Sequence, residues 1–191
     1  MRQFPIVQLL SVILLIPSIA PGADGHRHDK TPVAEKKPSV VIPEENQKKG
    51  EIPSMAPAEK MGRLMVDAIN QKKPQVAASA FFPADPFRNL KGIQDPDAYH
   101  KQLVSWFEQD LQREQIRYEK ELPLTYLGFQ KGSCKWKEPG SEANTIAYWS
   151  CYRNQMKVKT SKGAEVTIKV RVMINWGSEW YVTHLGPIPG N

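Results

Sequence analysis

The side chains that could take part in recognition gather in the last third of the chain. From Leu122 onward there are nine basic residues against four acidic ones, so this part holds most of the formal charge of +6. In the strand register derived below, Arg153 lies opposite Arg171, and Arg171 lies opposite His184. Like charges directly across a ladder destabilise a sheet. Such a row therefore predicts that something acidic meets it.

Aromatic side chains share this predicted face with the basic row. The expected surface comprises Trp149, Trp180, Arg153, Lys169, Arg171 and His184. An aromatic patch beside arginines predicts a surface for an anionic ligand or a protein partner. A homodimer formed through this face would be one such partner. The alternative is a solvated outer face on which the tryptophans rest under arginine stems.

The opposite face of the same sheet offers hydroxyl groups. Tyr148, Tyr152 and Tyr181 are expected to point inward, and Asp67 on the first helix is the nearest candidate base. An isomerase-like pocket would need such a carboxylate facing a tyrosine or acidic donor. However, the place of Asp67 on its helix does not direct it firmly inward. The sequence also contains no Ser-His-Asp set, GxSxG elbow, phosphate loop or HExxH motif. We therefore expect no catalytic residues and no cofactor.

Residues 1–23 have the three-part pattern of a secretory signal peptide. Met1-Arg2 gives a positive start, residues 4–16 form an apolar run, and small residues follow. The run is shorter than a membrane span requires, and no cysteine near the cleavage site could carry a lipid. We expect a secreted or periplasmic protein, not a lipoprotein, with no membrane attachment after cleavage. The alternative is an uncleaved anchor.

Residues 24–56 are expected to form a flexible, charged, proline-rich linker. The segment has no aromatic residue, so it cannot bury enough apolar area to offset the entropy of ordering. Cleavage after Ala23 would place His26 third from a free amine, an arrangement that binds Cu(II) or Ni(II), with His28 as an axial ligand. Cleavage at the neighbouring candidate site would remove this arrangement. We therefore expect two solvated histidines and no metal site.

The domain expected over residues 57–191 begins with helices and ends with strands. Apolar residues recur at helical spacing over 61–69, and a short helix fits residues 74–80. An irregular segment follows, and Asp95 then caps a third helix that runs to about Arg117. Strand-like patterns cover residues 124–137, 145–159, 165–176 and 179–185.

The turns and the cysteines predict the register of these strands. The loop at 161–163 places Val158 opposite Val166, and the turn at 177–178 places Ile174 opposite Tyr181. In a secreted protein Cys134 and Cys151 should form a disulfide. That bond would set Phe129 opposite Met156 and Leu127 opposite Val158, in agreement with the two turns.

Three amphipathic helices followed by a long, curved antiparallel sheet resemble the cone-shaped α+β fold of the nuclear transport factor 2-like superfamily. The locally similar pieces are the helix pair at 61–82 and the terminal hairpin NWGSEWYV at 175–182. The resemblance implies a pocket between helices and sheet. Some members of the superfamily are isomerases, hydrolases or cyclases, and many are non-catalytic binding or assembly domains. A cystatin-like roll is the alternative fold.

The expected protein is thus an α+β domain of three N-terminal helices packed on a curved four-stranded antiparallel sheet. We expect a secreted or periplasmic, non-enzymatic binding domain that engages an anionic ligand or partner, without specific nucleic-acid binding. The alternatives are a small-molecule enzyme with a pocket in the cone and a membrane-anchored assembly domain of an envelope complex.

Overall fold

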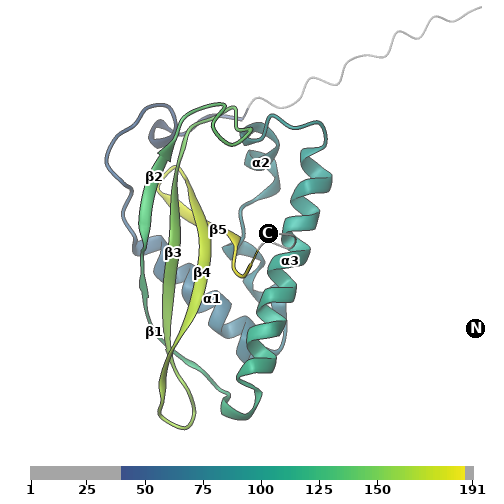
Figure 1. The fold of residues 1–191 in the computed structure, drawn as a ribbon, viewed down its shortest axis with the longest axis vertical. Helices are drawn as coiled ribbons and strands as arrows, with labels where there is room; N and C mark the ends of the chain where they lie inside the picture. The colour runs from purple at the N-terminus through teal and green to yellow at the C-terminus, as the bar shows by residue number, and fades with distance from the viewer. Residues whose placement is uncertain (1–39, 188–191) are drawn as a thin grey trace, which may run out of the picture. The chain divides into compact units, whose positions relative to one another are not determined.

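Helices occupy the first part of the described chain and an antiparallel sheet the second, so the expected α+β class is confirmed (Figure 1). The structure is a computed structural model that describes residues 40–187. The predicted signal peptide and the histidines at 26 and 28 lie outside these residues. No helix in the described part is long and apolar enough to cross a membrane.

Three α-helices precede the sheet, and they differ in part from the expected ones. They are α1 (Ala56–Gln71), α2 (Ala84–Leu90) and α3 (Pro96–Arg117). The expected helix at 74–80 is a 3₁₀ helix, η2 (Pro74–Ala80), while η1 (Glu44–Asn46) and η3 (Glu119–Glu121) are single short turns. Helix α2 lies in the segment expected to be irregular. Its Pro86 falls in the first helical turn, where no backbone donor is needed. As predicted, Asp95 caps α3, accepting from the Ala98 amide at 2.9 Å.

The sheet has five antiparallel strands among the described residues, one more than expected. They are β1 (Thr125–Gln130), β2 (Ser133–Lys137), β3 (Tyr148–Lys159), β4 (Glu165–Trp176) and β5 (Glu179–His184). Four of them follow the order β1-β3-β4-β5, and β2 is paired with β3 in addition. Strands β1 and β2 replace the single strand predicted at 124–137, and both pair with β3. The chain between them passes so close to β3 that a Cβ at Gly132 would lie 2.0 Å from the Tyr152 carbonyl oxygen. Only glycine fits at this step.

Most of the predicted register is confirmed. Cys134 and Cys151 are paired across β2 and β3 and form a disulfide. The other confirmed pairs are Phe129 with Met156, Val158 with Val166, and Ile174 with Tyr181. A disulfide is compatible with an extracellular or periplasmic location.

Two irregularities shift the register where the sequence analysis was wrong. Tyr126, not Leu127, lies opposite Val158, because β1 has an irregularity between Tyr126 and Gly128. Val172, not Arg171, lies opposite His184, because the β4–β5 ladder shifts between Val172 and Met173. A bulge of this kind re-aims the side chains beyond it.

Strand β3 has a kink at Arg153. This residue has a φ of 59°, in the left-handed region, between two regular pairs of the β3–β4 ladder. The next residue, Asn154, is fully buried and holds the kink. Its side-chain amide donates to the carbonyls of Cys151 and Val170, and its oxygen accepts from the Gly132 amide at 3.0 Å.

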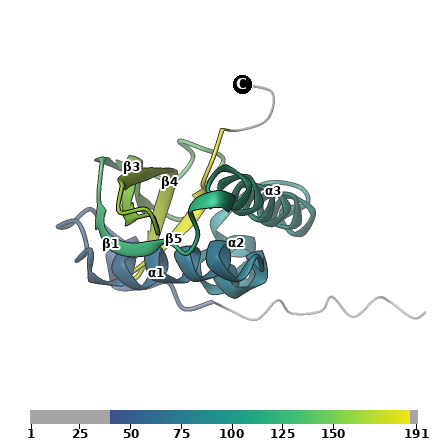
Figure 2. The same ribbon diagram turned by 90° about the horizontal axis from the view of Figure 1, so that it is seen from below.

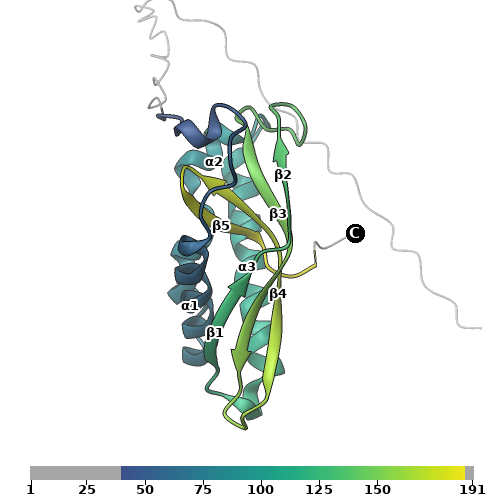
Figure 3. The same cartoon turned by 90° about the vertical axis from the view of Figure 1, so that its left-hand side faces the viewer.

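One hydrophobic core joins helices and sheet, and the sheet is covered differently along its length. Helix α1 packs on β1 and β5, and α3 packs on α1 and β5 (Figures 2 and 3). Near the β3–β4 hairpin only one face is buried, by Met156, Val158 and Ile168, while the alternate residues are exposed. Toward Tyr148 and Ile174 both faces are buried.

Residues 40–55, expected to belong to the flexible linker, form part of the folded domain. Asn46 is 2% exposed; its side chain donates to the Ala147 carbonyl at 2.9 Å and accepts from the Gly177 amide at 2.7 Å. The Trp180 indole donates to the Ser54 carbonyl at 3.0 Å. A polar segment can therefore pack here because its hydrogen bonds, rather than aromatic side chains, attach it to the sheet.

Candidate functional site

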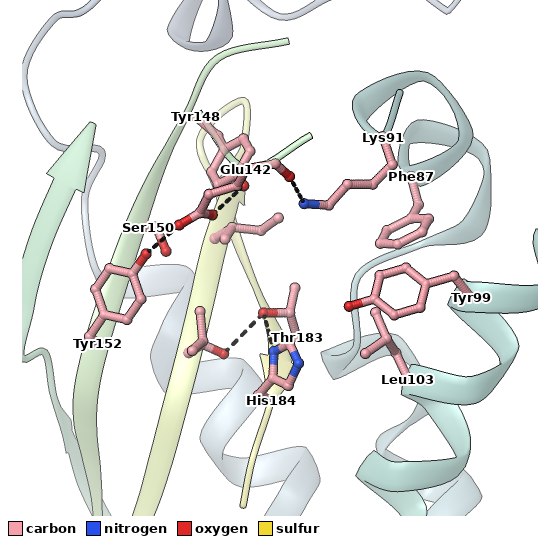
Figure 4. A pocket seen from close by; sticks show the side chains of 12 residues that line it. Phe87, Lys91, Tyr99, Leu103, Glu142, Tyr148, Ser150, Tyr152, Thr183 and His184 are labelled. Atoms are coloured by element: carbon pink, nitrogen blue, oxygen red, sulfur yellow. Dashed lines mark hydrogen bonds between the residues drawn. The ribbon is translucent and has the colours of Figure 1, made fainter. Parts of the chain in front are cut away.

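A partly enclosed cavity of about 300 Å³ lies between the sheet and helices α2 and α3 (Figure 4). This volume is at the lower end of the range found for small-molecule sites. The cavity is lined from four directions: strands β3 to β5, helix α2 and its C-terminal cap, helix α3, and the loop before β3. Its lining residues are Phe87, Lys91, Tyr99, Leu103, Glu142, Tyr148, Ser150, Tyr152, Val172, Ile174, Thr183 and His184.

The apolar wall of the cavity comes mainly from the two helices and β4. The rings of Phe87 and Tyr99 lie 6.0 Å apart, and Leu103 continues this wall one turn along α3. Val172 and Ile174 face them from the sheet. An apolar wall on both sides suits a compact hydrophobic or aromatic group.

The loop before β3 brings a carboxylate to the cavity. The Lys91–Gly92 backbone is tied to this loop, with the Gly92 amide donating to the Ala143 carbonyl at 2.8 Å. The buried Asn144 side chain holds the loop by donating to the carbonyls of Glu138 and Ile146. These contacts place Glu142 beside the end of α2.

Glu142 is held by three donors. The hydroxyls of Tyr148 and Tyr152 donate to its carboxylate at 2.8 and 3.2 Å, and Lys137 Nζ lies 2.5 Å from it. Burial alone would raise the pKa of Glu142, but these bonds outweigh it and the pKa is lowered. Conversely, burial and the bond to this carboxylate raise the pKa of Tyr148. Glu142 is therefore an ionised anchor whose hydrogen-bonding capacity is largely used within the protein.

Lys91 is a cation at the cavity with no carboxylate bonded to it. Its Nζ donates to the Glu142 backbone carbonyl at 3.1 Å and lies 5.9 Å from the centre of the Tyr148 ring. Burial lowers the pKa of Lys91; the Glu142 carboxylate acts against this shift, and the nearby Lys137 acts in the same direction as burial. The Lys91 ammonium thus keeps two donor protons for another acceptor.

His184 enters the cavity because of the shift between β4 and β5. Its Nδ1 lies 3.3 Å from the Thr183 hydroxyl oxygen, and that hydroxyl donates to the Val172 carbonyl at 3.5 Å. If the Thr183 hydroxyl donates to Val172 in this way, Nδ1 donates to that hydroxyl and Nε2 is left as an acceptor. Burial, together with Arg171 and Lys91, lowers the pKa of His184 to about 4. The ring is neutral at pH 7.

Ser150 is a cavity-lining hydroxyl without a hydrogen-bond partner. The residue is 1% exposed, and its Oγ is buried with no donor or acceptor within reach. A buried polar group left unpaired is costly, so it is a natural place for a ligand or water to bind. Figure 4 shows Ser150 between Tyr148 and Tyr152, with Tyr99 facing the sheet from α3.

This arrangement can bind more readily than it can catalyse. Lys91 supplies donors, Nε2 of His184 supplies an acceptor, and Ser150 supplies both. The ionised Glu142, already bonded to three donors, is a weak proton acceptor, and the neutral His184 has a pKa far below 7.

The residues expected to line a pocket are only partly brought together. Tyr148 and Tyr152 line this cavity. Tyr181 instead packs on Phe82, with ring centres 5.5 Å apart, and lines a different depression. Asp67 is exposed on α1 and lines none of the described cavities, so it is not a base in this site. Lys91, Glu142, Ser150 and the place of His184 were not predicted from the sequence.

The expected basic–aromatic face does not exist as one surface. Trp149 is 8% and Trp180 2% exposed, and both belong to the core, so neither is available to a partner or a second copy of the chain. Arg153, Lys169 and Arg171 are exposed on the outer face, while His184 lines the cavity. Two features account for the difference: the segment at 40–55 packs on Trp180 through Ser54, and the shift between β4 and β5 moves His184 into the cavity.

Within residues 40–187 no group of three or more His, Cys, Asp or Glu side chains could hold a metal ion. The alternative copper or nickel site at His26 and His28 falls outside the described residues. Comparisons of the chain with known protein families, with curated proteins and with solved structures found no match.

Proposed function

We propose that this domain binds a small organic molecule in the cavity beneath α2 and α3. The ligand would have a compact apolar body and one anionic or carbonyl oxygen. The observation that carries the proposal is that Lys91 and Ser150 supply unused donors to the same apolar-walled cavity.

The charge balance of the cavity favours an anionic ligand. Its one carboxylate, that of Glu142, is bonded to Lys137 and two tyrosines and acts on Lys91 only through space, so the two lysines together exceed it by one charge. A carboxylate bound at Lys91 would supply the missing counter-charge. Ser150 would donate to the same group or to a second oxygen, and Nε2 of His184 would accept from a ligand hydroxyl or amine.

The proposal keeps the binding role expected from the sequence but moves it from the sheet face to the cavity. A secreted or periplasmic location and a relationship to the nuclear transport factor 2-like superfamily belong to the same proposal. The disulfide is compatible with the first. The order of helices and strands, with a cavity between them, supports the second.

Binding of matched small probes would test the proposal. We expect protein-observed NMR to show that small aromatic carboxylates such as benzoate shift the amides around Thr183 and Tyr99, with benzamide weaker and benzylamine weakest. Lys91→Met removes the charge but keeps the length of the side chain. Since a hydrogen bond to a charged group contributes about 1.5–3 kcal/mol, this variant should weaken benzoate by roughly 10- to 100-fold.

Lys101→Met is the matched control, because Lys101 is exposed on α3 and lines none of the described cavities. Val172→Phe, which fills the cavity without removing a charge, should abolish binding of all probes. Equal binding of benzoate and benzylamine, or shifts that persist in Val172→Phe, would contradict the proposal. Melting temperatures would establish that each variant is folded.

A further inference from the structure

Three unpaired basic side chains lie together on the outer face of the sheet. We call Arg153 of β3, and Lys169 and Arg171 of β4 the basic band; all three are exposed. The larger of two depressions beside Arg153, of about 510 Å³, is lined by all three. The other, of about 500 Å³, lies on the cavity side of the sheet, where Lys135 is paired with Ser150. The basic band lies on the face opposite the cavity-lining residues of β4.

No carboxylate in the described chain neutralises the basic band. The ion pairs between residues 40 and 187 involve other basic residues, including Lys137 with Glu142. Asp110 lies next to the wall of the larger depression, but it accepts from the Gly186 amide at 2.6 Å and pairs with Arg113 at 2.9 Å. Three cations within one band repel one another unless a ligand supplies negative charge.

The protein holds this band in a fixed geometry. The left-handed kink at Arg153 places this residue in the band. Three hydrogen bonds of the buried Asn154 side chain maintain the kink. A non-glycine residue kept in this region is often part of a functional surface. Residues Leu185–Pro187 form the wall of the larger depression. The Arg171 amide of β4 donates to the Leu185 carbonyl, and the Gly186 amide donates to the Asp110 carboxylate of α3.

We propose that the basic band binds an extended acidic segment of a protein partner. Neighbouring strands lie about 5 Å apart and alternate residues of one strand about 7 Å apart, within the reach of two to three residues of extended chain, so two acidic side chains can meet the three cations. The wall at Leu185 and Pro187 gives the larger depression an apolar side as well as a charged one. A peptide with an apolar residue beside its acidic residues matches both sides, whereas a sulfated glycan matches only the charges.

The test measures binding of a fluorescent hexapeptide, Glu-Asp-Leu-Glu-Asp-Gly, to the full chain. We expect a micromolar Kd that weakens with added salt. The neutral double variant Arg153→Gln/Arg171→Gln should weaken binding at least 10-fold. Lys159→Gln/Lys162→Gln, at the distant β3–β4 hairpin, removes the same charge and should change the Kd less than twofold. Replacing the peptide leucine by serine should weaken binding at least threefold.

Several outcomes would overturn the proposal. Equal loss in the two double variants would show a response to net charge only, and a heparin tetrasaccharide that binds more tightly than the peptide would show a glycan site. A peptide Kd above 1 mM would also overturn it. Should the arginine variant unfold by circular dichroism, Lys169→Gln/Arg171→Gln takes its place. Benzoate binding in the cavity should be unchanged in these variants, so failure of one proposal is distinguishable from failure of the other.

Discussion

Replacing Arg153 by glycine should make the domain more stable, although the change removes a whole side chain. Arg153 is exposed and has a φ of 59° within β3. For a residue with a Cβ, the left-handed conformation costs about 1–2 kcal/mol, and glycine avoids this cost. The greater entropy of glycine in the unfolded chain offsets roughly 0.5–1 kcal/mol of the gain. Relative to alanine at this position, glycine should therefore raise the free energy of unfolding by about 1 kcal/mol.

The decisive comparison is between Arg153→Gly and Arg153→Ala, which both lack the guanidinium and differ only in the Cβ. In an ordinary strand position glycine is the less stable of the two by about 0.5–1 kcal/mol. Here we expect the opposite order, with the glycine variant more stable by about 1 kcal/mol, or roughly 2–4 °C in Tm. Urea denaturation and calorimetry would measure it. An alanine variant as stable as the glycine variant would refute the argument that the kink at Arg153 is strained. If the basic band binds as proposed, both variants should lose affinity for the acidic peptide.

Three further predictions concern stability. Gly132→Ala would place a Cβ 2.0 Å from the Tyr152 carbonyl oxygen, so we expect urea denaturation to show a loss of about 1–3 kcal/mol, whereas Gly128→Ala, which has open space, should cost under 1 kcal/mol. His184 has a pKa of about 4 when folded and near 6.5 when unfolded. The unfolded chain therefore binds more protons between these values, and the free energy of unfolding should fall by roughly 1–2 kcal/mol from pH 7 to pH 4, allowing for solvent screening. His184→Gln should flatten that part of the stability profile, and an unchanged slope would contradict the assignment. Removing the disulfide by Cys134→Ser/Cys151→Ser opens a link across 17 residues, so calorimetry should show a loss of about 3 kcal/mol, and an unchanged Tm would rule out that contribution.

The local patterns of the sequence predicted most of the sheet, because alternation and turn residues act over a few positions. The pairs Val158–Val166 and Ile174–Tyr181 follow from the turns alone. The kink at Arg153 was not predictable in this way, since it depends on close packing of Gly132 against β3 and on the buried side chain of Asn154. The separate register shift between Val172 and Met173 was not predicted either, and it moved His184 from the outer face into the cavity.

The candidate site was predicted less completely than the fold. Tyr148 and Tyr152 could be assigned to the inner face by strand periodicity. Lys91 and Glu142 could not, because they meet only through the contact between the end of α2 and the loop held by Asn144. The proline-rich segment at 40–55 lacked an apolar pattern, so nothing in its composition indicated that it covers Trp180 through Ser54.

The contacts of Asn46 also bear on when the domain can finish folding. Asn46 bonds to Gly177, 131 positions further along the chain, and the turn that contains Gly177 is among the last described parts to be synthesised. Closure of the amino-terminal segment over the sheet must therefore wait until nearly the whole domain has been made. Until then Asn46 can reach only its earlier partner, the Ala147 carbonyl, so the part of the sheet already made lacks its amino-terminal cover and is exposed to non-native contacts.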